Sequence, residues 1–268
     1  GATAQLTIVG MRTQSFQGVE IAPAPVIPKE TDEGPLVYNR NVAIFDRDAF
    51  YPEAPVLLSD PTQIRGVDAT ILGITPFQYN PVTGLLQVYT QVTVAVEAAG
   101  PGQLNVLERQ ARDLRPSVAF QDIYRTHFVN FAPTGRYQPI NEIGDMLVIC
   151  HDPWMSNMAP FVAHKNSIGI NTTIVGVSSI GNNHAAIQSY IQSVYDTTNL
   201  AFVLLVGDHS QVASPQSWGS AADPTYATVA GNDSYPDLLI GRFADAHNMI
   251  FLEVLLFENR IVGNGRGD

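Results

Sequence analysis

The sequence predicts two domains: an N-terminal antiparallel β-sandwich in residues 1–135 and a doubly wound α/β subdomain with a parallel sheet in residues 136–268. Short alternating runs separated by Pro and Gly fill the first half, which is typical of β-sandwiches. In the second half, apolar runs of strand length alternate with helical patterns, which indicates βαβ units. Between them, residues 132–136 (Ala-Pro-Thr-Gly-Arg) indicate an exposed linker.

The clearest strand of the first half is Leu85–Glu97, whose even positions are mostly Val or Leu and whose odd positions include Gln, Thr and Glu. It follows the turn signal Asn80-Pro81-Val82-Thr83-Gly84, in which Pro fixes φ and Gly accepts a positive φ. Further strands are expected at Leu6–Val9, Val19–Ala22, Val37–Ile44 and Ile64–Ile74. Apolar residues at helical spacing in 101–116 indicate a short amphipathic helix or an extended arm.

Four buried parallel strands are predicted in the second half, because their runs are almost entirely apolar: Met146–Cys150, Thr173–Val177, Ala201–Gly207 and Leu238–Ile240. A helix after the first strand tolerates Pro160 in its first turn and stops at Gly169. Asn182 or Asn183 caps a second helix, and a last helix is expected over Met249–Ile261.

Composition excludes several classes of function. The 268 residues include 14 Lys and Arg and 25 Asp and Glu, which gives a net charge of -11. Nucleic-acid binding is not expected because it needs clustered basic residues, and a chain this acidic would be repelled by anionic lipid. Since no run of 18 apolar residues occurs, no membrane insertion is expected. One cysteine, Cys150, excludes an intrachain disulfide and a multi-Cys zinc site.

Polar groups follow two of the predicted strands at their carboxyl ends, where open α/β sheets bind ligands. Cys150-His151-Asp152 offers a thiol, a base and an acid, but neighbouring strand residues face opposite sides. Cys150 is therefore interpreted as a buried structural residue and not as a nucleophile. After the third strand, Asp208-His209 offers a base for which no partner nucleophile is identifiable.

Three carboxylates suggest a cation site. Asp208 leaves the third strand, and Asp233 and Asp237 flank a Gly-rich bend. Ca²⁺ takes six to eight oxygen ligands, several of them carboxylates. The alternative is that these residues only form turns and cap helices.

Several stretches resemble gingipain-type cysteine peptidases in order and spacing. In the second half these are Phe161-Val162, Lys165-Asn166, Gly169, Phe202–His209, Val229–Asp233 and Ile240–Phe243; in the first half they are Pro76–Gly84 and Leu86–Tyr89. The resemblance implies a prodomain followed by the first subdomain of a caspase-like catalytic domain. It further implies the zymogen fragment of a secreted cysteine endopeptidase, extracellular or on a bacterial cell surface, that acts on protein or peptide substrates. The prodomain would pack on its own catalytic domain.

The resemblance also implies site residues. A structural Ca²⁺ would be held by Asp208, the Ala230 carbonyl, Asp233, the Tyr235 carbonyl and Asp237. The catalytic His and Cys are expected beyond Asp268, so no catalytic residue is assigned here and this chain is expected to be inactive. Arg136 is the candidate for the activating cut, and Arg112 or Arg115 could mimic a P1 side chain.

Two alternatives to the zymogen remain open. One is a non-catalytic or sortase-like relative of the fold that acts as a cell-surface binding or secretion component. The other is an unrelated calcium-stabilised adhesion domain. A His-Gly motif followed by a Cys after a strand, downstream of Asp268, would favour the peptidase.

Overall fold

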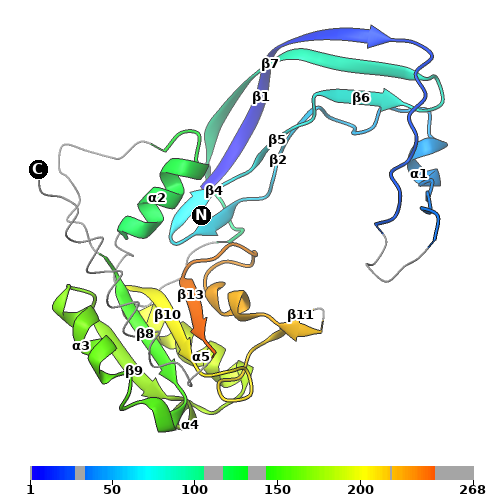
Figure 1. Ribbon diagram of the computed structural model, residues 1–268. Helices are drawn as coiled ribbons and strands as arrows, with labels where there is room; N and C mark the ends of the chain where they lie inside the picture. Colours follow the sequence, from blue (N-terminus) through cyan, green and yellow to red (C-terminus); the bar gives the residue numbers. More distant parts are fainter. Residues whose placement is uncertain (1, 28–33, 106–116, 132–142, 218, 245–268) are drawn as a thin grey trace, which may run out of the picture. The chain divides into compact units, whose positions relative to one another are not determined.

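The computed structural model describes residues 2–27, 34–105, 117–131, 143–217 and 219–244. Two compact units divide the chain (Figure 1): Gly1–Pro61 with Ala69–Gln103, and Thr62–Asp68 with Leu104–Asp268. Packing therefore divides the chain at other places than the predicted domain boundary at 135/136. The segment Thr62–Asp68 belongs to the second unit although its neighbours in sequence belong to the first.

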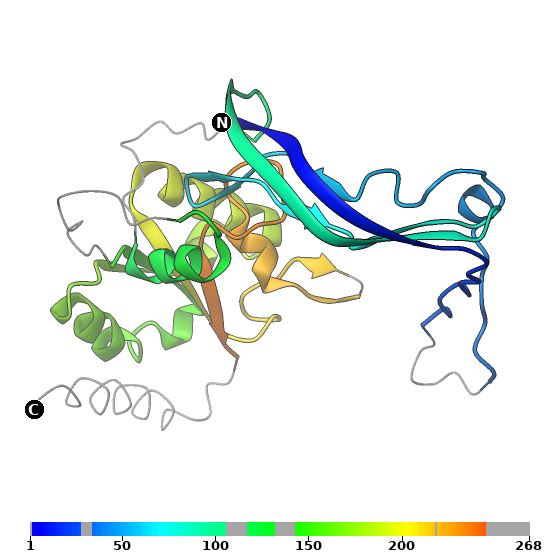
Figure 2. The same cartoon turned by 90° about the horizontal axis from the view of Figure 1, so that it is seen from above.

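A long antiparallel ribbon of β1 (Ala2–Phe16) and β7 (Leu85–Pro101) dominates the first unit, and Figure 2 shows it from a second side. β6 (Phe77–Asn80) pairs with the other edge of β7, and β2 (Val56–Leu58) pairs with β5 (Leu72–Ile74) in a separate two-stranded sheet. The ribbon carries three register shifts, as expected where bulges bend a long strand pair.

The strands expected at Leu6–Val9 and Leu85–Glu97 are confirmed, since they lie inside β1 and β7. The turn before β7 is confirmed as well: the Asn80 side chain accepts hydrogen bonds from the N–H groups of Val82 and Thr83, and Gly84 has a φ of +64°.

Two other strand predictions in this half are wrong, and a third is right only in part. Val37–Ile44 gives way to a short helix, α1 (Val42–Phe45), because the Asn41 side chain accepts the N–H of Ala43 and caps a helical turn there. No strand forms at Val19–Ala22. The strand expected at Ile64–Ile74 is confirmed in part, since β4 (Val67–Ala69) and β5 lie inside it, but the segment is interrupted at residues 65–66 and again at 70–71.

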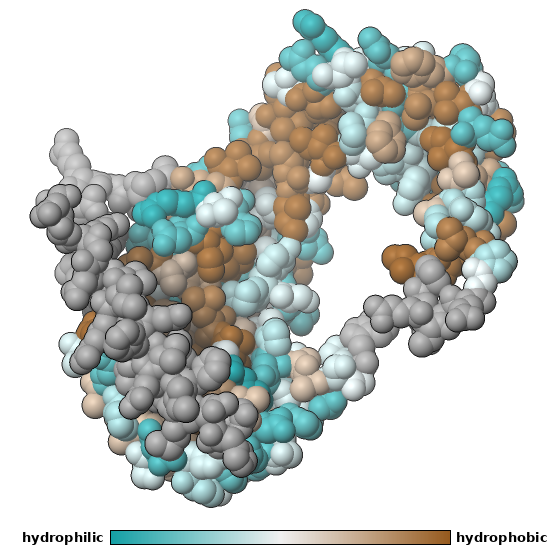
Figure 3. Space-filling model, in the orientation of Figure 1, coloured by the Kyte–Doolittle hydropathy of each residue, from teal (hydrophilic) through white to brown (hydrophobic). Residues whose placement is uncertain are grey.

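The first unit exposes much of its apolar surface. Along β1, Ile8, Val9, Met11 and Phe16 are between 39% and 66% exposed, and Figure 3 shows apolar surface over this ribbon. Both buried hydrophobic clusters of the described residues lie in the second unit. A sandwich buries the facing sides of two sheets. The antiparallel β-fold is thus confirmed for the first unit, whereas its closure into a sandwich stays a prediction.

Four parallel strands form the sheet of the second unit, in the order β13 (Leu239–Phe243), β10 (Leu200–Val206), β8 (Asp145–Cys150) and β9 (Thr172–Gly176). All four predicted strands are confirmed, and none of their ends is shifted by more than three residues. Helix α3 (Ala159–Ser167) follows β8, and α4 (Val177–Ile180) and α5 (His184–Thr197) follow β9. The sheet is therefore of the predicted α/β type.

Local signals set the helix ends. The Asn183 side chain accepts the N–H of Ala186 at 2.9 Å, which identifies Asn183, and not Asn182, as the cap of α5. Pro160 lies in the first turn of α3, and Gly169 beyond its end has a φ of +90°. The helix expected over Met249–Ile261 lies outside the described residues. Sequence reasoning missed α2 (Val118–His127), which buries Phe120 and Tyr124.

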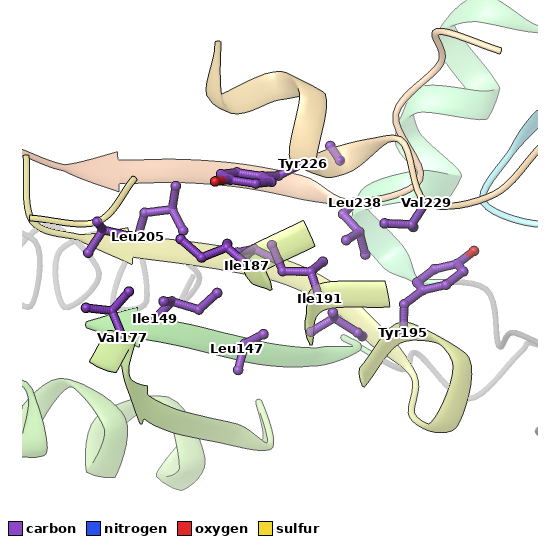
Figure 4. Close-up of a cluster of buried hydrophobic side chains, with 14 of the residues drawn as sticks. Leu147, Ile149, Val177, Ile187, Ile191, Tyr195, Leu205, Tyr226, Val229 and Leu238 are labelled. Carbon is purple, nitrogen blue, oxygen red and sulfur yellow. The ribbon is translucent and has the colours of Figure 1, made fainter. Parts of the chain in front are cut away.

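Alternating side chains of the central strands bury both faces of the sheet. Leu147 and Ile149 of β8 pack with Ile187 and Ile191 of α5 in the larger cluster (Figure 4). Val148 and Cys150 point to the other face of the sheet and belong to the second cluster, together with Phe161 of α3. Successive residues of a strand point to opposite faces of the sheet, and here both faces are buried. Both sets of side chains must therefore be apolar, which explains why these strands are continuous apolar runs.

Short elements complete the unit: β3 (Thr62–Ile64), β4 (Val67–Ala69), η1 (Asp152–Trp154), η2 (Asp223–Ala227), β11 (Gln216–Ser217) and β12 (Ser220–Ala221). Among the described helices, none is both long and apolar enough to cross a membrane.

Candidate functional site

The strand order places a topological switch point between β8 and β10. From β8 the chain moves to β9 on one side, and from β9 it returns across β8 to β10 on the other. Open α/β sheets bind ligands in the crevice outside the carboxyl ends of the strands at such a point. His151 follows β8 there and Asp208 follows β10, so this edge is the candidate site.

Cys150, the last residue of β8, is fully buried and unsuited to nucleophilic attack. Its thiol donates to the carbonyl of His151 at 3.3 Å. Burial, with a smaller contribution from the charge of Asp152, raises the pKa of the thiol to about 11. The thiolate is the reactive form, so this cysteine is inert near neutral pH. Its interpretation as a structural residue is confirmed.

His151 and Gly207 bring the loops after β8 and β10 together. The N–H of His151 donates to the carbonyl of Val206 at 2.8 Å. Gly207 has a φ of +136°, and a Cβ there would lie 3.3 Å from the Cβ of His151 and 3.1 Å from that of Gln211. Only glycine allows this approach without strain. On the other side, the His151 ring packs edge-on against Trp154, with centroids 5.1 Å apart.

Asp208 and His209 form an exposed carboxylate–imidazole pair beyond β10. The Nδ1 of His209 lies 2.7 Å from Oδ1 of Asp208, and the backbone N–H of His209 donates to the same oxygen at 2.6 Å. These hydrogen bonds, the backbone one first, lower the pKa of Asp208. Both side chains are more than half exposed, so the pair can orient a proton or a polar group presented from solvent.

Arg242 of β13 fixes the loop that carries this pair, a role that sequence reasoning missed. Its guanidinium binds both carboxylate oxygens of Asp223 at 2.7 Å. The same group donates to the carbonyls of Gly207 at 2.7 Å and Val212 at 2.9 Å. The sequence signal was the lone Arg in the apolar strand Leu239–Phe243, since a charge in such a strand needs partners.

At the opposite, amino edge of the sheet, Asp237 is fully buried. Its Oδ2 accepts the N–H groups of Ala230 at 2.8 Å and Val229 at 3.2 Å, and its Oδ1 accepts the N–H of Arg65 at 2.9 Å. Burial outweighs these hydrogen bonds and, with a smaller effect of Asp233, raises the pKa of the Asp237 carboxyl to about 6.

Asp233 is occupied in a similar way. Its Oδ2 accepts the N–H of Gln63 at 2.9 Å and the hydroxyl of Thr62, while its Oδ1 accepts the N–H of Tyr235 at 2.9 Å. Both carboxylates of the predicted bend therefore hold donors of the β3–β4 hairpin, which sequence reasoning did not place at a site.

The five residues of the predicted calcium site are not gathered in one place. Asp208 follows the carboxyl end of β10, whereas Asp237 precedes the amino end of the neighbouring parallel strand β13. The two lie about eight residues apart along the strand direction, or roughly 25 Å at 3.3 Å per residue. This corrects the inclusion of Asp208, because the carboxyl end of one parallel strand and the amino end of its neighbour lie at opposite edges of the sheet.

The carboxylates of Asp233 and Asp237 each accept three N–H or O–H donors of the protein, which leaves about one of the four acceptor positions of each for a cation. Throughout the described ranges, no group of three or more His, Cys, Asp or Glu is placed to hold a metal ion. Calcium binding itself stays a prediction. The processing candidates Arg112, Arg115 and Arg136 lie outside the described residues.

Comparison with known proteins matches both halves of the chain to one peptidase family. Residues 1–137 match the model of the C25 propeptide (Propeptide_C25), and residues 140–248 match that of peptidase family C25. Gingipain R2 of Porphyromonas gingivalis is 31% identical over 249 residues, which are 90% of this chain and 33% of the relative. Gingipain R1 of the same organism is 33% identical over 216 residues, 78% of this chain and 21% of the relative.

The chain spans at most a third of the length of these relatives. Among solved structures, a complex of Porphyromonas gingivalis RgpB pro- and mature domains is 29% identical and covers 48% of this chain and 64% of that chain, with a TM-score of 0.38. The two family matches favour the peptidase over the sortase-like alternative.

Proposed function

The chain belongs to peptidase family C25, with a C25 propeptide ahead of the peptidase region, and on this premise we propose that it is the zymogen portion of a secreted cysteine endopeptidase. The observation that carries the proposal is the order of the two matches along one chain: 1–137, then 140–248. A propeptide followed directly by peptidase sequence is the arrangement of a precursor.

The described site supports a scaffolding role for this part of the enzyme. β8 and β10 supply the switch-point edge, Gly207 lets their loops meet, and Arg242 fixes the loop after β10. In the whole enzyme a thiolate–imidazole pair would attack the scissile carbonyl and form an acyl-enzyme, which water then hydrolyses. The one cysteine of this chain is buried and protonated, so we infer that the rest of the catalytic domain supplies the dyad.

The test compares the peptidase activity of this chain with that of its parent, the longer precursor that contains the full peptidase region. The 268-residue chain is expected to show no thiol-dependent cleavage of peptides with Arg, Lys or neutral residues at P1, and the variant Cys150→Ala should be indistinguishable from it. The parent, extended through the full peptidase region, is expected to cleave at least one of them after the propeptide is cut. Cleavage by the short chain that is lost in Cys150→Ala would sink the proposal, as would an inert extended parent.

Finer features belong to the same proposal. Activation would cut at Arg136, and Arg112 or Arg115 would occupy the substrate cleft before the cut; N-terminal sequencing of the processed parent tests this assignment. The antiparallel unit would close as a β-sandwich prodomain packed on its catalytic domain. The family membership supports an extracellular or cell-surface location, and fractionation of expressing cells tests it.

A further inference from the structure

A seven-residue piece of the propeptide sequence belongs to the second compact unit, which holds the whole peptidase match together with propeptide residues 104–137. Thr62–Asp68 lies within the propeptide match but belongs to the compact unit that otherwise starts at Leu104. It forms the β3–β4 hairpin, whose two-residue turn has φ of +45° at Arg65 and +77° at Gly66. Positive φ at both central positions is the type I′ pattern of tight hairpins. A left-handed Arg is unfavourable by itself, so its contacts must offset that strain.

The Arg65 side chain is only 3% exposed and is held by acceptors at the amino end of β10. Its guanidinium donates to the carbonyl of Leu200, to Oδ1 of Asn199 at 3.1 Å and to the carbonyl of Asp237 at 3.3 Å. The guanidinium carbon also lies 5.1 Å from the ring centroid of Phe120 in α2, a contact within the propeptide match. A buried cation costs several kcal/mol unless such partners satisfy it.

The backbone of the hairpin is held as specifically as its side chain. Carboxylates of the peptidase unit accept the N–H of Gln63, on Asp233, and the N–H of Arg65, on Asp237. The hydroxyl of Tyr124 in α2 donates to the carbonyl of Ile64 at 2.9 Å, but α2 lies inside the propeptide match, so this bond stays within the propeptide when the chain is cut after residue 135. Hydrogen bonds to a charged acceptor are about twice as strong as neutral ones. We call the acceptors that the peptidase match contributes the slot, and they suit an Arg at the tip of a β-hairpin: Asn199, the Leu200 carbonyl, Asp233 and Asp237.

This slot lies at the amino edge of the sheet, whereas the switch-point crevice lies at the carboxyl edge. The hairpin itself therefore lies away from that crevice. We propose that the Thr62–Asp68 hairpin is a docking anchor that keeps the propeptide bound to the peptidase unit once the chain between them is cut, with Arg65 as its dominant residue. The inference rests on the proposed zymogen role, and it adds a retention site away from the catalytic edge. Arg in a desolvated pocket is a typical hot spot of protein interfaces.

The test cuts the connection and measures what remains bound. A cleavage site for a sequence-specific protease, flanked by Gly-Ser spacers, is inserted between Gly135 and Arg136 of the full chain. After cutting, the two pieces are expected to co-elute in size exclusion at low micromolar concentration. Arg65→Ala should weaken their association about 10- to 100-fold, and Arg65→Lys should lie between, since lysine keeps the charge but not the planar fork.

Matched variants keep the result interpretable. Arg47→Ala removes an exposed Arg that pairs with Glu53 in the first unit. It should leave the dissociation constant of the two cut pieces within about twofold of the value for the unsubstituted chain. Hydrogen exchange of β8 and β10 in the uncut Arg65→Ala chain shows whether the peptidase unit still folds. If it does not, the nearly isosteric Thr62→Val, which removes the hydroxyl donated to Asp233, should weaken association several-fold and decides the matter.

Separation of the cut parental pieces at micromolar concentration would overturn the anchor. The anchor would also be overturned if the cut pieces of Arg65→Ala bound each other as tightly as those of the unsubstituted chain. If Arg65→Ala unfolds, the same result with Thr62→Val would overturn it. The measurement needs no peptidase activity. If the longer precursor shows no peptidase activity, the proposed function is refuted but the anchor is not. If the cut pieces dissociate, only the anchor is refuted.

Discussion

Replacement of Arg242 by Ala should destabilise the α/β unit more than any exposed charge change. The Arg242 side chain is 12% exposed and that of Asp223 is 22% exposed, so both are largely removed from water. The substitution breaks a bidentate ion pair and leaves Asp223 uncompensated. It also removes the donors to the carbonyls of Gly207 and Val212. The loop after β10 loses its main restraint.

The expected loss is about 3–5 kcal/mol, the usual cost of removing one partner of a buried pair. At about 2–4 °C per kcal/mol for a unit of 150–250 residues, the unfolding temperature should fall by about 6–20 °C. Arg242→Lys should lose about 1–3 kcal/mol, because lysine keeps the charge but cannot reach both Asp223 and the carbonyls as a fork.

Urea unfolding followed by far-UV circular dichroism, with hydrogen exchange of β10 peptides to assign the loss to this unit, measures the effect. The control is Arg125→Ala on α2, whose ion pair with Asp122 is more than half exposed on both sides and should contribute less than about 1 kcal/mol. If Arg242→Ala costs no more than this control, the role given to Arg242 is wrong.

Three further outcomes are expected from the site. Burial raises the pKa of Asp223, but the hydrogen bonds of Arg242 and Ser214 and the charge of Arg242 outweigh it and leave the pKa below its usual value. The stabilisation is thus complete above the unfolded-state pKa and is lost as pH falls through the folded one, so the gap between parent and Arg242→Ala in urea melts should narrow below about pH 4; a constant gap would contradict this. Cys150 should react with a disulfide reagent at pH 8 at least about 100-fold more slowly in the native chain than in urea, because its thiol is buried with a pKa of about 11; fast native labelling would contradict its structural role. If the calcium prediction is right, millimolar Ca²⁺ should raise the unfolding temperature of the intact chain, because the ion binds the folded state, and Asp233→Asn should abolish the rise; an unfolding temperature unchanged within about 1 °C would contradict the prediction.

The α/β half was predictable because its signals are local. Apolar runs flanked by breakers fixed β8, β9, β10 and β13, and Asn183 and Gly169 marked helix ends through their own backbone preferences. The first half was less predictable, since short strands at exposed edges carry weak patterns. Val37–Ile44 has the apolar content of a strand, yet the cap at Asn41 starts a helical turn inside it.

Candidate site residues divide in the same way. Cys150 was correctly assigned as a buried structural residue, because strand alternation and the tendency of free Cys to be buried need only its neighbours in sequence. Asp208 and Asp237 could not be separated from the sequence, since both flank sheet strands and only the parallel pairing of β10 with β13 puts them at opposite edges. Arg65 gave no signal beyond an Arg-Gly turn, because its partners lie 134 to 172 residues away in the chain.

The sequence by itself determined the class of this protein: an acidic, low-lysine chain with one unreactive cysteine, an antiparallel β half and an α/β half, in the order of a peptidase precursor. Hydrophobic periodicity and helix caps depend on residues close together in sequence, and composition needs only the residue counts, so all three can be recognised without a structure. Only the tertiary structure decided which carboxylates meet, that Arg242 fixes the loop after β10, and that a propeptide hairpin lies in the peptidase unit. Those contacts join residues far apart in sequence, and their geometry exists only once the sheet has set its register.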